Sequence, residues 1–509
     1  MYSKVLILDF GSQVTKLIAR NVRELNVYCE IISYDTNIDK IKQLKPDCII
    51  FSGSPASIYD KKPPLFDKKL LDINLPILGI CYGAQLISKI YKSNVKKSKI
   101  REFGPAKLIK NKNHKILLGI KNNSVSWMSH GDTIVKLGKN LEGLAKSEFG
   151  SIALFKHKNK NIFGTQFHPE VVHTSFGKDF LSNFIFNIAK CKSNWRPGKL
   201  IKNKTAEIKK QIGNGRAISA ISGGVDSSVS SVLVAKAIGS KLKSFIVDTG
   251  LMRKNEVKLI VPNLKKLGVN PKIINASKLF FKRLKGITNP EKKRKIIGKT
   301  FIELFEKEAN KTNANFLVQG TLYPDVIESV SISGPSAVIK SHHNVGGLPK
   351  RMKLSLVEPL RDLFKDEVRV LGKSLGIEKD LIGRHPFPGP GLAIRILGEV
   401  TEERVKILQE ADDIYTRLLK EKKLYDQIWQ AFCVLIPIKT VGVMGDERTY
   451  ENTIAIRAVN STDGMTASWS RIPYDVLDLI SSEIINSVKG INKVVFDISN
   501  KPPSTIEWE

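Results

Sequence analysis

The stretch Ala220-Ile221-Ser222-Gly223-Gly224-Val225-Asp226-Ser227-Ser228 decides how the centre of the chain folds. An apolar run with strand character, RAISAI, leads into it, and a helical pattern of small residues, SSVSSVLVAKAI, leads out of it. A strand that passes through a glycine turn into a helix directs backbone N–H groups and the positive end of the helix dipole at one point, which favours a bound phosphate. The stretch therefore predicts an anion-binding loop in an α/β fold.

This loop is not a Walker A loop, because no lysine follows its glycines. It resembles the PP-loop of the N-type ATP pyrophosphatases, which cleave ATP between its α and β phosphates and activate an oxygen as an adenylate. The resemblance implies Mg²⁺ bound with ATP, with Asp226 as a direct or water-mediated ligand. A serine-capped turn is the alternative interpretation. The implied ATP contacts are Ser222, Gly223, Gly224, Val225, Asp226, Ser227 and Ser228.

Length and composition limit the class of protein. A chain of 509 residues is too long for one core and predicts about three domains. Its content of 42% hydrophobic and 26% charged residues is typical of a soluble globular protein. No apolar run approaches the roughly 18 residues of a membrane helix, and the N-terminus enters a strand pattern without a signal peptide. We therefore expect a cytoplasmic protein without a membrane partner.

The formal net charge of +33 raises the alternative of nucleic-acid binding through phosphate contacts. However, the lysines are scattered through every segment, and no RNA-binding signature with interleaved aromatic residues accompanies them. We expect no nucleic-acid partner. The five cysteines form no CxxC pair and are odd in number, which favours neither a disulfide framework nor a zinc site.

The first domain contains a candidate nucleophile, Cys81. Apolar strands alternate with amphipathic segments up to about residue 190, the βαβ rhythm of a mostly parallel sheet, in which catalytic residues follow the strand ends. Gly79 and Gly83 flank Cys81 and allow a sharp strand-to-helix turn that exposes the sulfur. A later strand end supplies His168 and Glu170, a base and a group to orient it. A buried structural cysteine and a packed histidine are the alternatives.

Cys81, His168 and Glu170 resemble, in motif and chain order, the triad of the class I glutamine amidotransferases. The resemblance implies that Cys81 attacks the side-chain amide of glutamine and that ammonia is released. In this family the oxyanion loop usually reads Ser-Gly-Gly-Pro, whereas here it reads Ser52-Gly53-Ser54-Pro55, so the backbone angles at Ser54 are open to question. The residues implied for glutamine and its oxyanion are Gly53, Ser54, Tyr82 and Gln85, and His130 is expected to be structural.

A second strand end and a glycine-rich segment extend the ATP domain. The strand LKSFIVDTG ends in Val247 and Asp248, which the resemblance to the ATP pyrophosphatases places at the adenine or ribose, although Asp248 also suits a helix N-cap. The segment KSHHNVGG is cationic, and we expect a mobile lid that brings Lys340 to the phosphates. Its paired histidines lack the further ligands of a metal site.

The C-terminal part, from HPFPGPG onward, reads as a smaller α+β unit and ends in KPPSTIEWE. Together with an ammonia source and an adenylating site, these motifs make the whole chain resemble the glutamine-hydrolysing GMP synthetase family. The resemblance implies a homodimer and the conversion of XMP, ATP and glutamine to GMP, AMP, pyrophosphate and glutamate. The implied XMP-binding residues are Arg294, Asp446, Lys501, Thr505, Ile506 and Glu507. A solvated helix face for Arg294 and a turn for Asp446 are the alternatives.

The expected architecture is α/β, with two doubly wound, mostly parallel-sheet domains and a smaller C-terminal α+β dimerisation domain. We place the amidotransferase domain at 1–193, the ATP pyrophosphatase domain at 194–384, and the dimerisation and XMP-binding domain at 385–509. Two other functions stay open at this point. They are an RNA-modifying ATP pyrophosphatase and an inactive amidotransferase-like binding protein.

Overall fold

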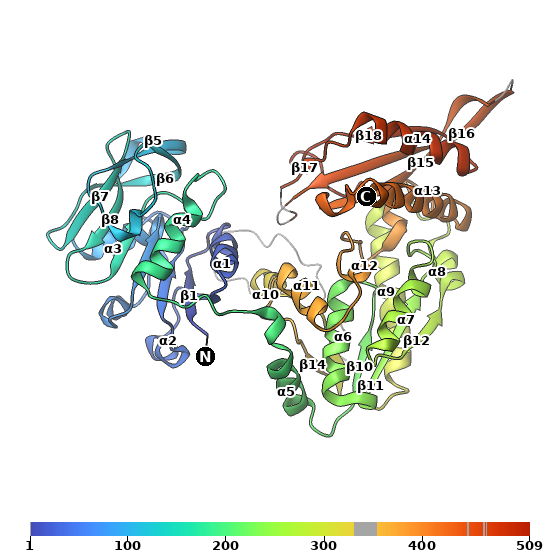
Figure 1. Ribbon diagram of the computed structural model, residues 1–509, viewed down its shortest axis with the longest axis horizontal. Helices are drawn as coiled ribbons and strands as arrows, with labels where there is room; N and C mark the ends of the chain where they lie inside the picture. Colours follow the sequence, from blue (N-terminus) through green and yellow to red (C-terminus); the bar gives the residue numbers. More distant parts are fainter. Residues whose placement is uncertain (1, 330–353, 445–446, 462–463, 465) are drawn as a thin grey trace. The chain divides into compact units, whose positions relative to one another are not determined.

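The computed structural model describes residues 2–329, 354–444, 447–461, 464 and 466–509. The chain divides into two compact units, which are considered one at a time. The first comprises residues 1–196 together with 324–343, and the second comprises residues 197–323 and 344–509. Figure 1 follows the chain from the blue N-terminus to the red C-terminus. The predicted residues Lys340 and Asp446 lie outside the described residues.

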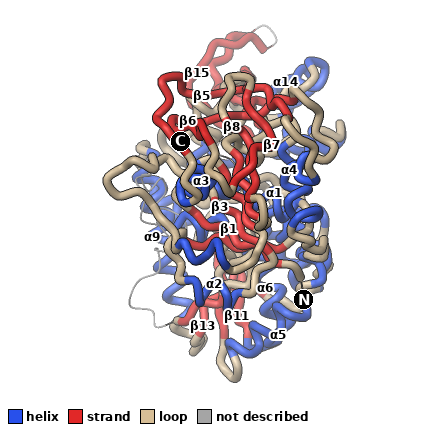
Figure 2. Tube along the Cα trace, turned by 90° about the vertical axis from the view of Figure 1, so that its left-hand side faces the viewer, coloured by secondary structure: helices blue, strands red, loops and turns tan. Residues whose placement is uncertain are grey.

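The first unit is built on a nine-stranded sheet. Its first five strands run parallel, as the alternating pattern predicts, and the last four add an antiparallel half. Figure 2 shows β1 and β3, which pair in parallel, near the middle of the sheet. The order is β2 (Tyr28–Ser33), β1 (Lys4–Asp9), β3 (Cys48–Phe51), β4 (Ile77–Ile80), β9 (Ile162–Thr165), β8 (Ile152–His157), β7 (Leu141–Ser147), β5 (Asn94–Lys110) and β6 (Ser124–Lys136).

The helices of the first unit pack through apolar faces and end at identifiable caps. In α1, Ile18, Ala19 and Val22 recur at helical spacing and are buried. In α2, the side chain of Asn37 accepts a hydrogen bond from the backbone N–H of Asp39 at 2.7 Å and so caps the N-terminus. The elements are α1 (Thr15–Glu24), α2 (Ile38–Leu44), η1 (Lys68–Asp72), α3 (Tyr82–Ile90), η2 (Lys115–Leu117), α4 (Gly177–Ser182) and the π-helical turn η3 (Asn183–Ile188).

The second unit contains a five-stranded, wholly parallel sheet. Its order is β12 (Pro271–Asn275), β11 (Leu242–Asp248), β10 (Ala217–Ala220), β13 (Phe316–Val318) and β14 (Ser355–Val357). Asn289 caps the long helix α9, and proline occupies the first helical position after it, where its missing N–H has no cost. The accompanying helices are η4 (Pro197–Lys199), α5 (Ile201–Ile212), α6 (Val225–Ile238), η5 (Gly239–Lys241), α7 (Glu256–Lys266), α8 (Ser277–Leu284), α9 (Pro290–Ala309), α10 (Tyr323–Ser329), α11 (Lys365–Ser374) and α12 (Lys379–Ile382).

A second sheet of four strands closes the second unit. The central strand β16 pairs antiparallel with β15 and β17 and parallel with β18. One hydrophobic core runs from residues of the parallel sheet, such as Phe245, to residues of α13, such as Leu408. The elements are η6 (Gly391–Arg395), α13 (Glu402–Glu421), η7 (Tyr425–Gln427), β15 (Gln430–Met444), β16 (Glu447–Asn460), β17 (Ser468–Trp469), α14 (Tyr474–Ser487) and β18 (Ile491–Asp497).

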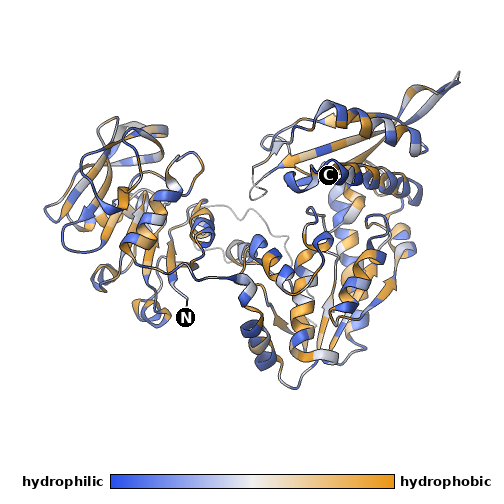
Figure 3. Cartoon of the chain, viewed as in Figure 1, coloured by the Kyte–Doolittle hydropathy of each residue, from blue (hydrophilic) through white to orange (hydrophobic). Residues whose placement is uncertain are grey.

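These sheets confirm the predicted α/β class. Figure 3 shows the apolar residues concentrated in the strands of each unit and the polar residues on the outer faces of the helices. The end of the first unit at residue 196 lies close to the predicted boundary at 193, whereas the proposed boundary at 384 falls inside the second unit and stays a prediction. None of the helices in the described part of the chain is long and apolar enough to cross a membrane.

Candidate active sites

Cys81 stands at the turn between β4 and α3, where it is the N-cap residue of the helix. Its φ is 49° and its ψ is −104°, a left-handed backbone conformation that is strained for a residue with a side chain. The backbone N–H of Cys81 donates to the carbonyl of Thr165 on β9 at 2.7 Å, which anchors the turn to the neighbouring strand. This geometry is that of a nucleophile elbow.

Two glycines make this turn possible. A Cβ on Gly79 would lie 2.7 Å from the backbone nitrogen of Ala84, and a Cβ on Gly83 would lie 2.6 Å from the Cβ of Phe51. Contacts this short are not tolerated between non-bonded carbon and backbone atoms. The two glycines that flank Cys81 in the sequence are therefore required by the close approach of α3 to β3 and β4.

The side chains of His168 and Glu170 lie beside this elbow. His168 Nδ1 is 2.7 Å from Glu170 Oε1, and both side chains are buried. A Cβ on Gly53 would lie 3.3 Å from His168 Cε1 and 3.8 Å from the Cβ of Cys81, so the imidazole and the thiol meet next to Gly53. The structure thus brings together the three predicted catalytic residues in the order thiol, imidazole, carboxylate.

The two histidines of this site differ in charge. Burial lowers the pKa of His168, but Glu170 and then Cys81 outweigh burial and raise this pKa well above its ordinary value. Burial and the charge of His168 instead lower the pKa of His130 to about 4. Glu102 lies 3.7 Å from His130, but a histidine with that pKa is neutral at pH 7 and forms no ion pair there. His130 is a neutral lining residue, which agrees with its predicted structural role.

A cavity of about 600 Å³ opens onto Cys81 and His168. Ser54 and Gln85 also line it, together with the strand segment from Trp127 to Asp132. Gln85 is held in place by its Nε2, which donates to the carbonyl of Asp132 at 2.7 Å. Ser54 is not among the residues with positive φ, so a glycine is not needed there. Tyr82 begins α3, and its backbone N–H belongs to the first turn, which lacks intrahelical acceptors.

The predicted ATP loop joins β10 to α6 in the second unit. Gly223 has a φ of 82°, and Gly224 is the N-cap of α6. The serines brace the loop, because Ser227 Oγ accepts from the N–H of Ser222 at 3.3 Å and Ser228 Oγ donates to the carbonyl of Gly224 at 2.8 Å. Val225 is buried as the first helical residue. The loop therefore has the conformation of an anion-binding helix N-terminus.

Asp226 lies in the first turn of α6. One of its oxygens accepts from Lys365 Nζ at the start of α11, and the other oxygen is buried without a hydrogen-bond partner among the described residues. Gly320, at the end of the neighbouring strand, packs directly against Asp226, because a Cβ there would lie 3.1 Å from its carbonyl carbon. A lysine, a carboxylate and a helix N-terminus thus meet at this edge of the sheet.

Val247 and Asp248 end β11, the parallel neighbour of β10. The carboxyl ends of parallel strands lie at the same edge of a sheet, so these residues lie on the side where the ATP loop begins. Val247 is buried, and Asp248 Oδ1 accepts from the N–H of Gly250 at 3.0 Å. This bond stabilises the turn after the strand and involves no helix N-terminus.

The predicted XMP-binding residues near the C-terminus belong to one ordered segment. Lys501 Nζ donates to the carbonyl of Gly464 at 2.7 Å. The carbonyls of Thr505 and Ile506 each accept from Arg457 at 2.9 Å. The segment is therefore docked, as its prolines and tryptophan predict.

Two further predicted residues, Glu507 and Arg294, are also engaged at this segment. Arg395 donates to both carboxylate oxygens of Glu507, at 3.0 and 2.8 Å. Arg294 Nη2 donates to the backbone oxygen of Glu509. The structure therefore brings Arg294, which is remote in sequence, to the end of the C-terminal segment.

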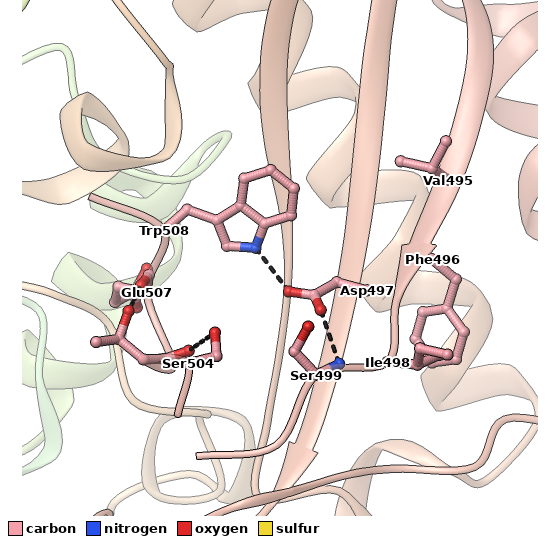
Figure 4. Close-up of a pocket in the computed structure, with 9 residues that line it drawn as sticks. Val495, Phe496, Asp497, Ile498, Ser499, Ser504, Glu507 and Trp508 are labelled. Atoms are coloured by element: carbon pink, nitrogen blue, oxygen red, sulfur yellow. Dashed lines mark hydrogen bonds between the residues drawn. The ribbon is translucent and has the colours of Figure 1, made fainter. Parts of the chain in front are cut away.

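A cavity of about 470 Å³ lies against this segment. Figure 4 shows Glu507, Ser504 and Trp508 on one side and Asp497 on the other. The indole N–H of Trp508 donates to Asp497 Oδ2 at 2.9 Å. The cavity combines carboxylate, hydroxyl and aromatic groups, which suits a polar ligand with a flat ring.

Comparison with known proteins places the whole chain in one family. It is 54% identical to "GMP synthase [glutamine-hydrolyzing]" of Aquifex aeolicus over 506 residues, 99% of both chains. It is equally identical to the protein of that name from Cytophaga hutchinsonii, over 100% of both chains. The chain belongs to the glutamine-hydrolysing GMP synthase family. None of these relatives is named as an RNA-modifying enzyme, so that alternative receives no support.

Two family models that match parts of the chain agree with membership of the GMP synthase family. The family described as "Glutamine amidotransferase class-I" matches residues 6–188, and "GMP synthase C terminal domain" matches residues 417–508. The chain is also 34% identical to a putative GMP synthase from Thermoplasma acidophilum with a known crystal structure. This likeness covers 37% of this chain and 95% of the other, with a TM-score of 0.33.

Sequence reasoning missed several residues of this GMP synthase family member. Lys365 pairs with Asp226 from 139 residues away, and Arg395 reaches Glu507 from 112 residues away. Both sit in segments without a glycine loop or other local motif that would mark them, so only the folded chain identifies them. Gln430, which also contacts Glu507, opens a strand and gave no signal.

Proposed function

We propose that this protein makes GMP from XMP, ATP, glutamine and water, and releases AMP, pyrophosphate and glutamate. The observation that carries the proposal is that one chain holds both Cys81 at a nucleophile elbow facing His168 and a glycine loop of the PP type at residues 222–228. The first arrangement suits ammonia release from an amide, and the second suits attack on ATP.

In the glutamine half-reaction, the Sγ of Cys81 attacks the amide carbon and its proton passes to His168. The C–N bond then breaks, His168 returns the proton to the leaving nitrogen, and ammonia departs from a glutamyl thioester. Water, activated by the same imidazole, hydrolyses the thioester to glutamate and restores the thiol. Glu170 holds Nδ1 of His168 so that Nε2 is available for these transfers. Backbone N–H groups at Gly53, Ser54 and Tyr82 are proposed to stabilise the oxyanion.

In the synthetic half-reaction, the 2-oxygen of the xanthine ring attacks the α phosphorus of ATP. Pyrophosphate leaves, and an adenylated XMP results. Ammonia then attacks carbon 2, and AMP leaves with the former 2-oxygen, which gives GMP. We assign the phosphates to residues 222–228 and Lys365, and the adenosine to Val247 and Asp248. Lys340 is proposed as a further phosphate contact. Arg294, Asp446, Lys501, Thr505, Ile506 and Glu507 are proposed for XMP.

A magnesium ion fits the residues at the ATP loop. Asp226 carries a buried oxygen with no hydrogen-bond partner in the described part of the chain, and Mg²⁺ bound with ATP commonly takes one or two protein carboxylates plus phosphate oxygens. No cluster of three or more metal-ligating side chains occurs among the described residues, so the phosphates would have to supply further ligands. When bound, the ion would neutralise charge on the leaving pyrophosphate. We also propose a cytoplasmic homodimer in which residues 385–509 form the dimer contact.

Replacement of the nucleophile tests the division of labour. The Cys81→Ala variant should lose glutamine-driven GMP formation and keep ammonia-driven formation, because ammonia bypasses the thioester. Cys29→Ala, a buried thiol outside the cavity, serves as the matched control and should keep both activities. Loss of both activities in Cys81→Ala, with the control active, would contradict the scheme.

The identity of the nucleotide is tested by pyrophosphate release. The wild-type protein with ATP and Mg²⁺ should release pyrophosphate when given XMP and should not do so with IMP or tRNA. Release with tRNA and none with XMP would overturn the proposed substrate and revive an RNA-modifying enzyme.

A further inference from the structure

Three cationic side chains in the described residues are completely buried, and all three contact the segment 505–509. Lys293 contacts the carboxylate of Glu509, Arg395 contacts the carboxylate of Glu507, and Arg457 contacts backbone carbonyls. A buried cation is unfavourable unless it is paired and hydrogen-bonded. Three such cations around five residues specify the conformation of that segment more than a hydrophobic contact would.

Among these three, Arg395 is the one that holds a side chain assigned to the substrate. Its Nε donates to Glu507 Oε2 at 3.0 Å, and its Nη2 donates to Oε1 at 2.8 Å. This paired geometry fixes both the position and the plane of a carboxylate, which a lysine cannot do. The guanidinium is itself fixed by the ring of Phe432, whose centroid is 4.0 Å away, and by Phe387 at 5.2 Å.

The acceptor capacity of Glu507 is mostly used by these contacts. An ionised carboxylate has about four acceptor positions, two on each oxygen. Oε1 accepts from Arg395 and from Gln430 Nε2 at 2.8 Å, whereas Oε2 accepts only from Arg395 among the described residues. One acceptor position on Oε2 therefore remains, on a residue that lines the cavity of Figure 4. A ligand there must offer an N–H or hydroxyl donor.

We propose that Arg395 is a positioning residue for the nucleotide substrate. It holds Glu507 so that a single carboxylate acceptor faces the cavity, and Gln430 closes the other oxygen. This inference rests on the proposed function and deepens it, because it explains how Glu507 selects a donor group of the purine nucleotide. Arg395 acts through Glu507 and does not itself need to touch the substrate.

The test compares Arg395→Lys with the wild-type protein. Lysine keeps the positive charge but loses the paired donors, so we expect the KM for XMP to rise about 10- to 100-fold, the loss of a charge-assisted hydrogen bond, with the KM for ATP changed less than about twofold. Arg417→Lys, whose partners Glu421 and Glu483 lie on the helical surface, is the matched control and should leave both KM values unchanged.

A double-mutant cycle separates positioning from a general loss of structure. In a Glu507→Gln background, adding Arg395→Lys should raise the KM for XMP by less than about threefold, because residues that act as one unit are not additive. Gln430→Leu gives a second probe of the same carboxylate, and we expect a smaller rise in the KM for XMP alone. It also serves if Arg395→Lys does not fold.

The outcomes keep this inference distinct from the proposed function. If the wild-type protein releases pyrophosphate with XMP but Arg395→Lys and Gln430→Leu leave the KM for XMP unchanged, the positioning role is wrong and the function stands. An equal rise in the KM values for XMP and ATP, or full additivity with Glu507→Gln, also overturns it. If the wild-type protein releases no pyrophosphate with XMP, the proposed function fails first.

Discussion

The surroundings of Cys81 and the loop at residues 222–228 are prepared for chemistry in different ways. Around Cys81, reactive side chains are buried, and the backbone is strained at the nucleophile itself. In the glycine loop, the groups offered to a ligand are mainly backbone N–H groups at a helix start, with Asp226 as the one acidic side chain within it. The first site therefore depends on which side chains are present, and the second depends on the path of the backbone.

The sharpest way to break this comparison is to neutralise Glu170. We expect Glu170→Gln to lower glutamine-driven synthesis by about 10³- to 10⁴-fold, the scale seen when a buried carboxylate that orients a catalytic histidine becomes an amide. Ammonia-driven synthesis should stay within about twofold of wild type in initial-rate assays, because free ammonia does not need the thioester. Glu148→Gln, an exposed carboxylate of the same unit, is the control. Equal loss with both nitrogen donors would refute the separation.

The complementary change lies in the glycine loop. Asp226→Asn should lower synthesis from glutamine and from ammonia alike by about 100-fold, because a fixed charge at the phosphates is lost. The midpoint of a Mg²⁺ titration should also rise. Asp413→Asn, on a partly exposed ion pair with Lys254, provides the matched control. A variant that keeps its Mg²⁺ midpoint would show that Asp226 is no ligand.

A glycine substitution sharpens the comparison at the level of stability. Gly79→Ala should destabilise the first unit by about 1–3 kcal/mol, since its new Cβ overpacks against backbone atoms. Gly298→Ala has open space and a helical position in α9, so it should be neutral or stabilising by up to about 1 kcal/mol. Thermal unfolding measures both. Equal midpoints for the two variants would mean that the tight turn relaxes freely.

The smallest expected effect concerns a histidine of the second unit. His385 Nδ1 accepts from the N–H of Ala431 at 3.0 Å and its Nε2 lies 2.9 Å from the carbonyl of Tyr425, so the ring is neutral. Burial lowers its pKa to about 4, opposite to the raised pKa of His168. Because the unfolded chain binds this proton below its ordinary pKa and the folded chain does not, stability is full above pH 6.5 and falls toward pH 4.

This linkage predicts a loss of about 1 kcal/mol between about pH 7 and about pH 5.5 from His385 alone. His385→Gln should flatten the pH dependence of the unfolding midpoint over that interval, and the exposed His173→Gln should not. An unchanged slope in His385→Gln would contradict the neutral buried histidine.

Local motifs explain what the sequence could predict. Gly79, Cys81 and Gly83 lie within one turn, and the glycine loop is one continuous stretch, so the strand-to-helix geometry follows from neighbouring residues. The helices at α13 and α14 were likewise predictable from their apolar spacing. The parallel half of the first sheet followed from the alternation of strands with helices.

Contacts between remote segments explain what the sequence could not predict. Lys365, Arg395 and Gln430 find their partners only after the parallel sheet and the C-terminal segment have folded together. The antiparallel half, β5 to β8, pairs strands whose lengths and bulges no simple alternation encodes. Long-range pairing, and not residue type, is the missing information.

Trp195 has a practical consequence for dividing the gene. Its indole is buried, and its ring centroid lies 4.7 Å from that of Tyr28 and 4.8 Å from the Arg23 guanidinium. A truncation that stops before Trp195 would expose this aromatic cluster and favour aggregation of the shortened polypeptide. Separate expression of the two halves should therefore place the junction after Arg196, where the indole stays with the fragment that buries it.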